Sequence, residues 1–128
     1  MLADTSAWIE FLRGTGSDAH LRLRRGLEAG ELATTDAVAM EILAGARSAG
    51  HRDQLKRLLL RSEFVATQGP RDYEDAAELF RAWRAAGEGV RGLTDCLIAA
   101  VAIRAGLPVL HADADFAAIA RHTPLTVT

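Results

Sequence analysis

The strongest constraint on the fold is the alternation of short apolar runs, each about as long as a buried strand, with longer segments whose apolar residues recur at helical spacing. Strand candidates span residues 2–4, 32–34, 64–67, 107–111 and 125–127. Such alternation predicts an α/β protein in which a mainly parallel sheet of about four to five strands carries helices on both faces. Right-handed crossovers then collect the carboxyl ends of the strands at one edge, where ligands bind in such sheets.

The helical segments are predicted from apolar residues spaced three and four apart and from the residues that begin or end each segment. In residues 70–86, for example, Tyr73, Phe80 and Trp83 fall on one side of a helix. Asp36 and Thr94 are predicted to cap the helices that follow them. The predicted helices cover residues 6–12, 21–27, a segment after Asp36, and residues 51–60, 70–86, 95–104 and 115–121.

Length and composition indicate one ordinary globular domain covering residues 1–128. The longest apolar run, Cys96 to Ile103, is far shorter than the roughly 20 residues of a membrane-spanning helix, so no membrane anchor is predicted. Asp4 and Glu10 interrupt the region where a secretory signal would lie, which makes the cytoplasm the default location. The single cysteine, Cys96, lies in an apolar helical pattern and is interpreted as a small buried side chain.

The net charge of −2 argues against a protein that binds nucleic acid by bulk charge alone. Fourteen of the fifteen basic residues are nevertheless arginines, which bind phosphate oxygens bidentately. If several carboxylates were neutralised by bound metal ions, the working protein would be more positive than its formal charge indicates.

Five acidic residues stand outside the polar helical faces where most acids of the chain fall. Asp4 ends the first strand, Asp113 and Asp115 follow the strand at 107–111, Asp95 begins an apolar helix, and Glu41 interrupts another apolar helix. An ionised acid buried alone in any of these places would cost stability. The pattern therefore indicates a positive group among them.

Mg²⁺ and Mn²⁺ suit this set, because hard cations take oxygen ligands and Mg²⁺ typically keeps several waters. The chain lacks the cysteine and histidine sets of a structural zinc site. Hydrolysis of a phosphodiester is the chemistry that fits, since a bound ion activates water and offsets charge in the transition state. Both one-ion and two-ion arrangements remain open.

Four segments of the sequence resemble, in order and spacing, the four successive motifs of PIN domains. They are Asp4–Trp8, Met40–Gly45, Leu93–Ala100 and His111–Phe116. The resemblance covers nearly the whole chain. Within PIN proteins, the length and the position of the first motif, four residues from Met1, resemble the VapC toxins of bacterial toxin–antitoxin pairs.

This resemblance implies a Mg²⁺- or Mn²⁺-dependent endoribonuclease that acts on RNA, forms a homodimer and is inhibited by a VapB-type antitoxin. It implies that Asp4, Glu41, Asp95 and Asp113 form the metal-binding and catalytic set. Asp115 would be a further ligand or would contact one. Ser6, which matches the polar residue of the first motif, would hydrogen-bond a carboxylate or a water on the metal.

Several residues in or beside the four motifs allow two interpretations. Thr94 either contributes to the site or only caps its helix, and Arg91 either meets a substrate phosphate or is a solvated loop residue. His111 stands where the family commonly has a hydroxyl residue, and a hydrogen-bonded structural role is favoured over metal ligation. Trp8 and Trp83 are assigned to the core or to a dimer surface.

Other functions fit less well. A response-regulator receiver needs a lysine at a late strand end, but Lys56 is in mid-helix. A haloacid-dehalogenase-like phosphatase needs a second Asp where Ser6 stands. The remaining alternative is a catalytically silent PIN-like module that binds RNA or protein. Because every expected acid is present, the enzyme is favoured.

Overall fold

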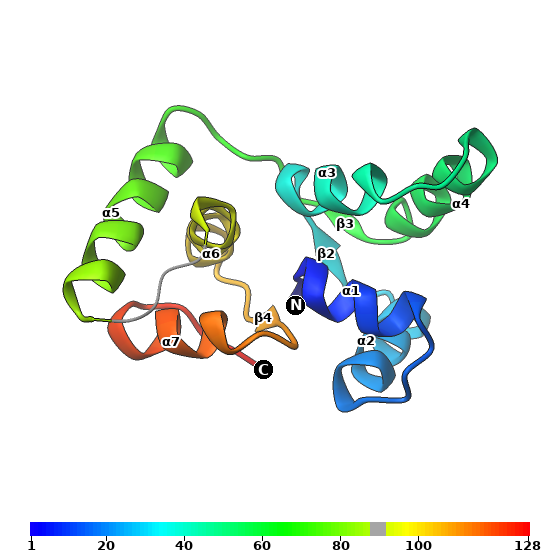
Figure 1. The fold of residues 1–128 in the computed structure, drawn as a ribbon, viewed down its shortest axis with the longest axis horizontal. Coiled ribbons are helices and arrows are strands. Elements are labelled where there is room, and N and C mark those ends of the chain that lie inside the picture. Colours follow the sequence, from blue (N-terminus) through cyan, green and yellow to red (C-terminus); the bar gives the residue numbers. More distant parts are fainter. Residues whose placement is uncertain (88–91) are drawn as a thin grey trace.

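The computed structural model describes residues 1–87 and 92–128, except the side chains of Asp115 and His122. Four parallel strands form one sheet in the order β3-β2-β1-β4. They are β1 (Leu2–Ala3), β2 (Ala33–Thr34), β3 (Glu63–Phe64) and β4 (Val109–Leu110). Near the C-terminus, Val127 forms a parallel bridge with Val109, so the chain end lies beside β4 (Figure 1). The predicted parallel α/β fold is confirmed.

Seven helices lie between and after the strands. They are α1 (Thr5–Leu12), α2 (Asp18–Ala29), α3 (Asp36–Ala44), α4 (Ala49–Leu59), α5 (Arg71–Ala85), α6 (Leu93–Ala105) and α7 (Ala114–His122). From β1 the chain moves outward through β2 to β3, and it then returns past β1 to β4. Because parallel crossovers are right-handed, this reversal places α1 to α4 on one face and α5 to α7 on the other (Figure 1).

The core forms where the two helix groups meet the sheet. All residues of β1, β2 and β4 are buried, as expected for a parallel sheet covered on both faces. Helix α6 is apolar around most of its circumference and runs through the centre of the core, with Cys96 among its buried residues. Trp8 and Trp83 are also buried, which assigns both tryptophans to the core and not to a dimer surface.

A buried ion pair joins α5 to α6 and to the segment that follows β3. Arg104 donates from Nε and Nη2 to the carboxylate of Asp72, at 2.8 to 3.1 Å, and from Nη2 to the carbonyl of Ala66 at 2.9 Å. The backbone N–H of Gln68 donates to the same carboxylate at 2.7 Å. Burial alone would raise the pKa of Asp72, but these hydrogen bonds and the charge of Arg104 outweigh it and lower that pKa.

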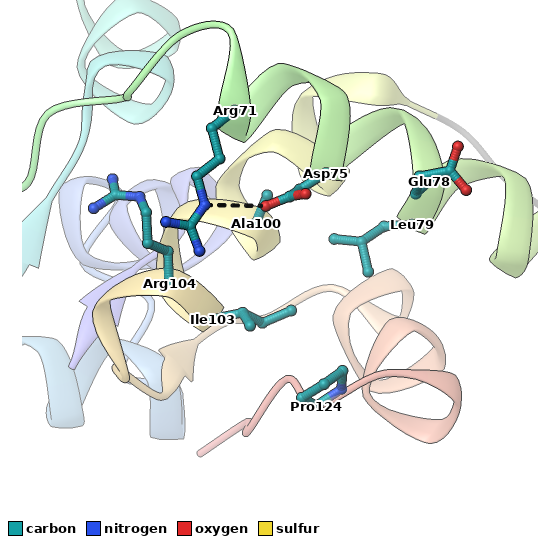
Figure 2. A pocket seen from close by; sticks show the side chains of 8 residues that line it. All are labelled: Arg71, Asp75, Glu78, Leu79, Ala100, Ile103, Arg104 and Pro124. Carbon is teal, nitrogen blue, oxygen red and sulfur yellow. Dashed lines mark ion pairs between the residues drawn. The ribbon is translucent and has the colours of Figure 1, made fainter.

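Arg104 also borders a pocket of about 240 Å³ between α5, α6 and Pro124 (Figure 2). On its α5 side, Arg71 and Asp75 form an ion pair with 3.8 Å between nitrogen and oxygen. None of the described residues that line this pocket is a predicted site residue.

Two predicted helix caps are wrong. Helix α6 begins at Leu93 with Gly92 as its N-cap, so Thr94 lies inside the first turn and caps nothing. Thr35, and not Asp36, is the N-cap of α3. The carboxylate of Asp36 instead accepts a long-range hydrogen bond from the backbone of Thr67 at 2.6 Å, a contact that local sequence does not indicate.

The strands are shorter than predicted. Of the predicted segment 64–67 only Phe64 is in a strand, and β3 begins one residue earlier, at Glu63. Of 107–111 only Val109–Leu110 is in a strand, and the predicted strand at 125–127 is reduced to the bridge at Val127. Val65 and Leu107, which lie close to the paired residues, are apolar because they pack partly buried against the core. In residues 1–87 and 92–128, no helix combines the length and the apolar character that a membrane crossing requires.

Candidate active site

The point where the sheet order reverses lies between β1 and β4, and two predicted acids lie there. Asp4 follows β1 and is held beside β4 by a 2.9 Å hydrogen bond from its N–H to the carbonyl of Leu110. Asp113 follows β4 and directly precedes α7. The chain leaves β1 toward one face of the sheet and β4 toward the other. In open parallel sheets this divergence creates the crevice in which ligands bind.

Ser6 connects the two loops at this crevice. Its backbone N–H and its hydroxyl both donate to Oδ2 of Asp4, at 3.0 and 2.6 Å. The hydroxyl oxygen accepts a hydrogen bond from the backbone N–H of Ala112 at 2.9 Å. Asp4 is also the N-cap of α1, so one oxygen of its carboxylate is committed to the helix start.

The other oxygen of Asp4 is the most unusual atom of the site. Asp4 is only 3% exposed, and within the described part of the chain its Oδ1 has no hydrogen-bond partner. Burial raises the pKa of Asp4; hydrogen bonds from Ser6 and Thr5 lower it in part, and the charge of Asp113 raises it further. The effect of Asp113 on this pKa is the smallest of these.

Other buried polar atoms also lack described partners, but all of them are neutral. They are Trp8 Nε1, Thr34 Oγ1, Ser62 Oγ and Trp83 Nε1. A carboxylate oxygen in this position carries a far larger desolvation cost than an indole or a hydroxyl. A hard cation that contacts Oδ1 would offset that cost, so the donor at this position fits Mg²⁺ or Mn²⁺.

Glu41 reaches the site through a contact that sequence reasoning missed. It is exposed on α3, and its Oε1 accepts a 2.9 Å hydrogen bond from the hydroxyl of Thr5. Glu41 is therefore not the buried acid that its apolar helix suggested. Thr5 stands between Asp4 and Ser6 in the first motif, and this position was the only sequence signal for its role.

The loop after β4 holds Asp113 next to His111. The backbone N–H of Asp113 donates to Nδ1 of His111 at 3.3 Å, and the His111 ring packs against Phe116 with 5.7 Å between ring centroids. These contacts favour the structural role of His111 over metal ligation. Asp115 belongs to α7, but its side chain lies outside the described part of the structure.

Asp95 lies half-buried in the first turn of α6. Helix α6 contacts α3, the helix that carries Glu41. Arg91 lies outside the described residues. Among the side chains that the structure describes, no three of the Asp, Glu, His and Cys residues are close enough to share an ion. The full set of metal ligands therefore stays a prediction.

The site opens onto a groove of about 520 Å³ between α1, α3 and α4. Thr5 and Glu41 lie in its wall, together with apolar and basic residues from the three helices. The groove therefore shares two residues with the candidate site. It is separate from the pocket in Figure 2, which lies between α5, α6 and Pro124.

Comparison with known proteins gives three consistent likenesses. The model of the PIN domain family matches residues 1–122. The chain is 46% identical over 127 residues to a VapC ribonuclease of Mycobacterium bovis and to Ribonuclease VapC11 of Mycobacterium tuberculosis, covering 98% of this chain and 95% of each relative.

Two solved structures share the fold at low identity. One is VapBC2 from Rickettsia felis bound to a DNA fragment from their promoter, with a TM-score of 0.74, 17% identity and coverage of 99% and 96% of the two chains. The other is DNA-bound VapBC from Salmonella typhimurium, with a TM-score of 0.75, 18% identity and coverage of 99% and 95%.

Proposed function

Because the chain belongs to the PIN-domain family and, within it, to the VapC ribonucleases, we propose that it is a metal-dependent endoribonuclease that hydrolyses phosphodiester bonds of RNA. The observation that carries this proposal is the buried, unpartnered Oδ1 of Asp4 beside Asp113. A charged oxygen is not retained in such a place without compensation, and a divalent cation supplies it.

Asp4, Asp95 and Asp113 are the residues that would hold Mg²⁺ or Mn²⁺, with Asp115 as a further ligand. When bound, the ion lowers the pKa of a water and offsets charge on the pentacovalent transition state. Ser6 fixes the carboxylate of Asp4 so that Oδ1 faces away from the helix start.

We assign to Glu41 the role of general base. The Thr5 hydroxyl occupies Oε1, which leaves Oε2 as the oxygen that accepts a proton from the attacking water. We further assign Arg91, four residues before Asp95 in the sequence, to a substrate phosphate. Thr94, in the first turn of α6, is assigned to a supporting contact.

The family also supplies a biological role. We propose that the protein is the toxin of a VapBC-type pair, that it acts on RNA in the cytoplasm as a homodimer, and that a VapB-type antitoxin restrains it. The acidic crevice predicts the chemistry of the inhibitor: a tail with a basic residue, best an arginine that pairs bidentately with two carboxylates.

The alternative is a catalytically silent module that binds RNA or protein with the same fold. The deciding experiment incubates the purified protein with total RNA, in Mg²⁺ and in chelator, and maps the new RNA ends. Discrete cuts that disappear with chelator and in Asp4→Asn support the nuclease. Binding of RNA without new ends in Mg²⁺ or Mn²⁺ would overturn it in favour of the module.

A further inference from the structure

We propose that the groove between α1, α3 and α4 is a nucleotide subsite of the active site. In it, Arg13 and Arg47 bind the phosphate that neighbours the scissile phosphate in the same RNA strand. This inference rests on the proposed nuclease function. The nucleotide groove is lined by Ile9, Leu12, Arg13, Glu41, Arg47 and His51, among others.

The groove adjoins the candidate site and is large enough for a nucleotide. Glu41 and Thr5, which hydrogen-bond each other at the edge of the site, also form part of the groove wall. A strand whose scissile phosphate lies at the carboxylates therefore has a continuous path into the groove. Its volume of about 520 Å³ is within the range of pockets that hold small-molecule ligands, and so has room for one nucleotide.

The charge of the groove indicates an anionic occupant. Arg13 ends α1, and Arg47 follows α3; both are exposed. Within residues 1–87 and 92–128, neither guanidinium forms an ion pair with a carboxylate. A guanidinium fork matches the geometry of phosphate oxygens, so two unpaired forks in one groove suit a sugar–phosphate chain.

His51 adds a donor to the same wall. Its Nδ1 accepts a hydrogen bond from the backbone N–H of Arg47 at 3.1 Å. In the neutral ring this contact places the proton on Nε2, which is then free to donate. The contact also holds the His51 ring next to Arg47. The Arg47 guanidinium and the His51 Nε2–H can then bind the same ligand.

The remaining lining is apolar and partly open. Ile9 and Leu12 are 40% and 43% exposed, and Ile42 and Leu55 lie buried behind them. This surface suits the face of an unpaired base, which must leave a duplex to reach it. No described lining residue carries a Phe, Tyr or Trp ring. Base stacking therefore contributes little, and the subsite should tolerate different bases.

The same charges disfavour a basic segment of the inhibitory partner as the occupant. If the basic tail proposed above lay in this groove, Arg13 and Arg47 would repel it. A polyanion has the opposite preference. We therefore propose RNA as the occupant of the groove. The experiment below also tests whether the antitoxin binds there.

The test uses Arg13→Gln, Arg47→Gln and the double variant. Arg57→Gln is the matched control, because Arg57 is an exposed arginine of α4 that does not line the groove. Binding of a short, fluorescein-labelled, mixed-sequence single-stranded RNA is measured by anisotropy in chelator, over a range of salt. Cleavage of the same RNA in Mg²⁺ gives kcat and KM.

We expect each substitution to weaken RNA binding roughly three- to tenfold and to reduce the slope of log Kd against log salt by about 0.7, the value for one phosphate contact on a single strand. KM should rise with little change in kcat, since a contact outside the reacting atoms binds the ground state and the transition state alike. Arg47→Lys should restore part of the affinity, and Arg57→Gln should behave as wild type.

The outcomes separate the subsite from the nuclease function. If wild type cuts RNA and the double variant matches Arg57→Gln in affinity, salt slope and KM, the subsite is overturned. If the double variant loses antitoxin affinity but binds RNA normally, the groove belongs to the protein partner. If wild type never cuts RNA but the double variant still loses RNA affinity, the subsite stands and the nuclease proposal falls.

Discussion

Ser6 donates two hydrogen bonds to a single oxygen of Asp4, one from its backbone N–H at 3.0 Å and one from its hydroxyl at 2.6 Å. Both bonds reach Oδ2, so the carboxylate is oriented by one oxygen while Oδ1 stays buried without a described partner. This asymmetry leads to the first two predictions.

Asp4→Asn should reduce RNA cleavage by more than about a hundredfold, because the amide cannot replace an ionised metal ligand. The metal-free variant should be as stable as wild type or slightly more stable, since Asn also caps helices well and carries no charge to desolvate. Thermal unfolding in chelator measures this. Glu28→Gln, at an exposed position of α2, is the control for loss of an acid. A fully active Asp4→Asn protein would remove Asp4 from the site.

The pH dependence of that comparison has a definite sign. The folded-state pKa of Asp4 is raised, so the folded state holds this proton more tightly than the unfolded state. Wild type should therefore lose stability relative to Asp4→Asn as pH rises from about 4, the unfolded pKa, through the folded pKa. An unchanging gap between the two proteins across this window would contradict the raised pKa.

Ser6→Ala should lower cleavage by roughly tenfold to a hundredfold through misorientation of Asp4. It removes a hydrogen bond that lowers the pKa of Asp4, so the acid limb of the pH–rate profile should move to higher pH. It also removes the acceptor of the Ala112 N–H, at little cost in stability because this N–H is exposed and water can accept from it. Ser6→Thr keeps the hydroxyl and serves as the control. A lower rate with an unmoved pH profile would show that Ser6 acts in another way.

Asp72→Asn should destabilise the fold by about 3 kcal/mol, because it leaves the charge of Arg104 without its buried partner. Glu78→Gln, which breaks an exposed pair with Arg81 on the same helix, should cost no more than about 0.5 kcal/mol. Urea unfolding at neutral pH measures both. Equal effects of the two substitutions would show that burial does not strengthen the Asp72 pair.

The Asp72 pair also predicts an acid response. The folded pKa of Asp72 is lowered, so its contribution is complete above the unfolded pKa and is lost as pH falls through the folded pKa. The stability gap between wild type and Asp72→Asn should therefore narrow below about pH 4. A gap that widened on acidification would have the wrong sign.

Dimerisation is predicted to use the apolar surface next to β3, which is the edge strand of the described sheet. Leu60 and Phe64 are 80% and 55% exposed there. Trp8, which sequence analysis assigned to the core or to a dimer surface, is buried. Leu60→Glu should convert a dimer to a monomer in sedimentation at micromolar concentration, while Leu12→Glu should not. Wild type that sediments only as a monomer without antitoxin would refute the dimer.

Antitoxin and Mg²⁺ are predicted to oppose each other, because a basic tail and the cation use the same carboxylates. The purified protein is titrated with a VapB-type antitoxin at low and high Mg²⁺, at fixed ionic strength. Affinity should fall at high Mg²⁺. Affinity that does not respond to the metal would mean that the antitoxin inhibits by covering the RNA groove and leaves the carboxylates free.

Sequence reasoning predicted the parts of the site that follow from chain order. Alternating strands and helices place the ends of β1 and β4 at one edge of a parallel sheet, so the proximity of Asp4 and Asp113 follows from the topology. The bond between Thr5 and Glu41, and that between Asp72 and Arg104, join residues 36 and 32 positions apart. Such pairs depend on how helices dock, which local periodicity does not encode.

Helix starts were the other weak point. Thr94 has the right side chain for a cap, yet the N-cap of α6 is Gly92, two residues earlier. A cap contributes about 1 kcal/mol, which is less than the burial of one large apolar side chain, so packing of α6 in the core sets its register. Asp72 was missed for a related reason: it lies among the exposed acids Glu74 and Asp75, and only tertiary structure distinguishes it.

Asp4 assigns its two oxygens to different tasks, one to the start of α1 and one to the crevice. Inactivation and misfolding are therefore separable at this position. A chain that carries an amide there keeps its helix cap and escapes the proteases that remove misfolded proteins. It would accumulate to normal abundance and still occupy its partners. A cell that inherits such a copy beside an intact one would hold a folded decoy that draws inhibitor away from the active enzyme.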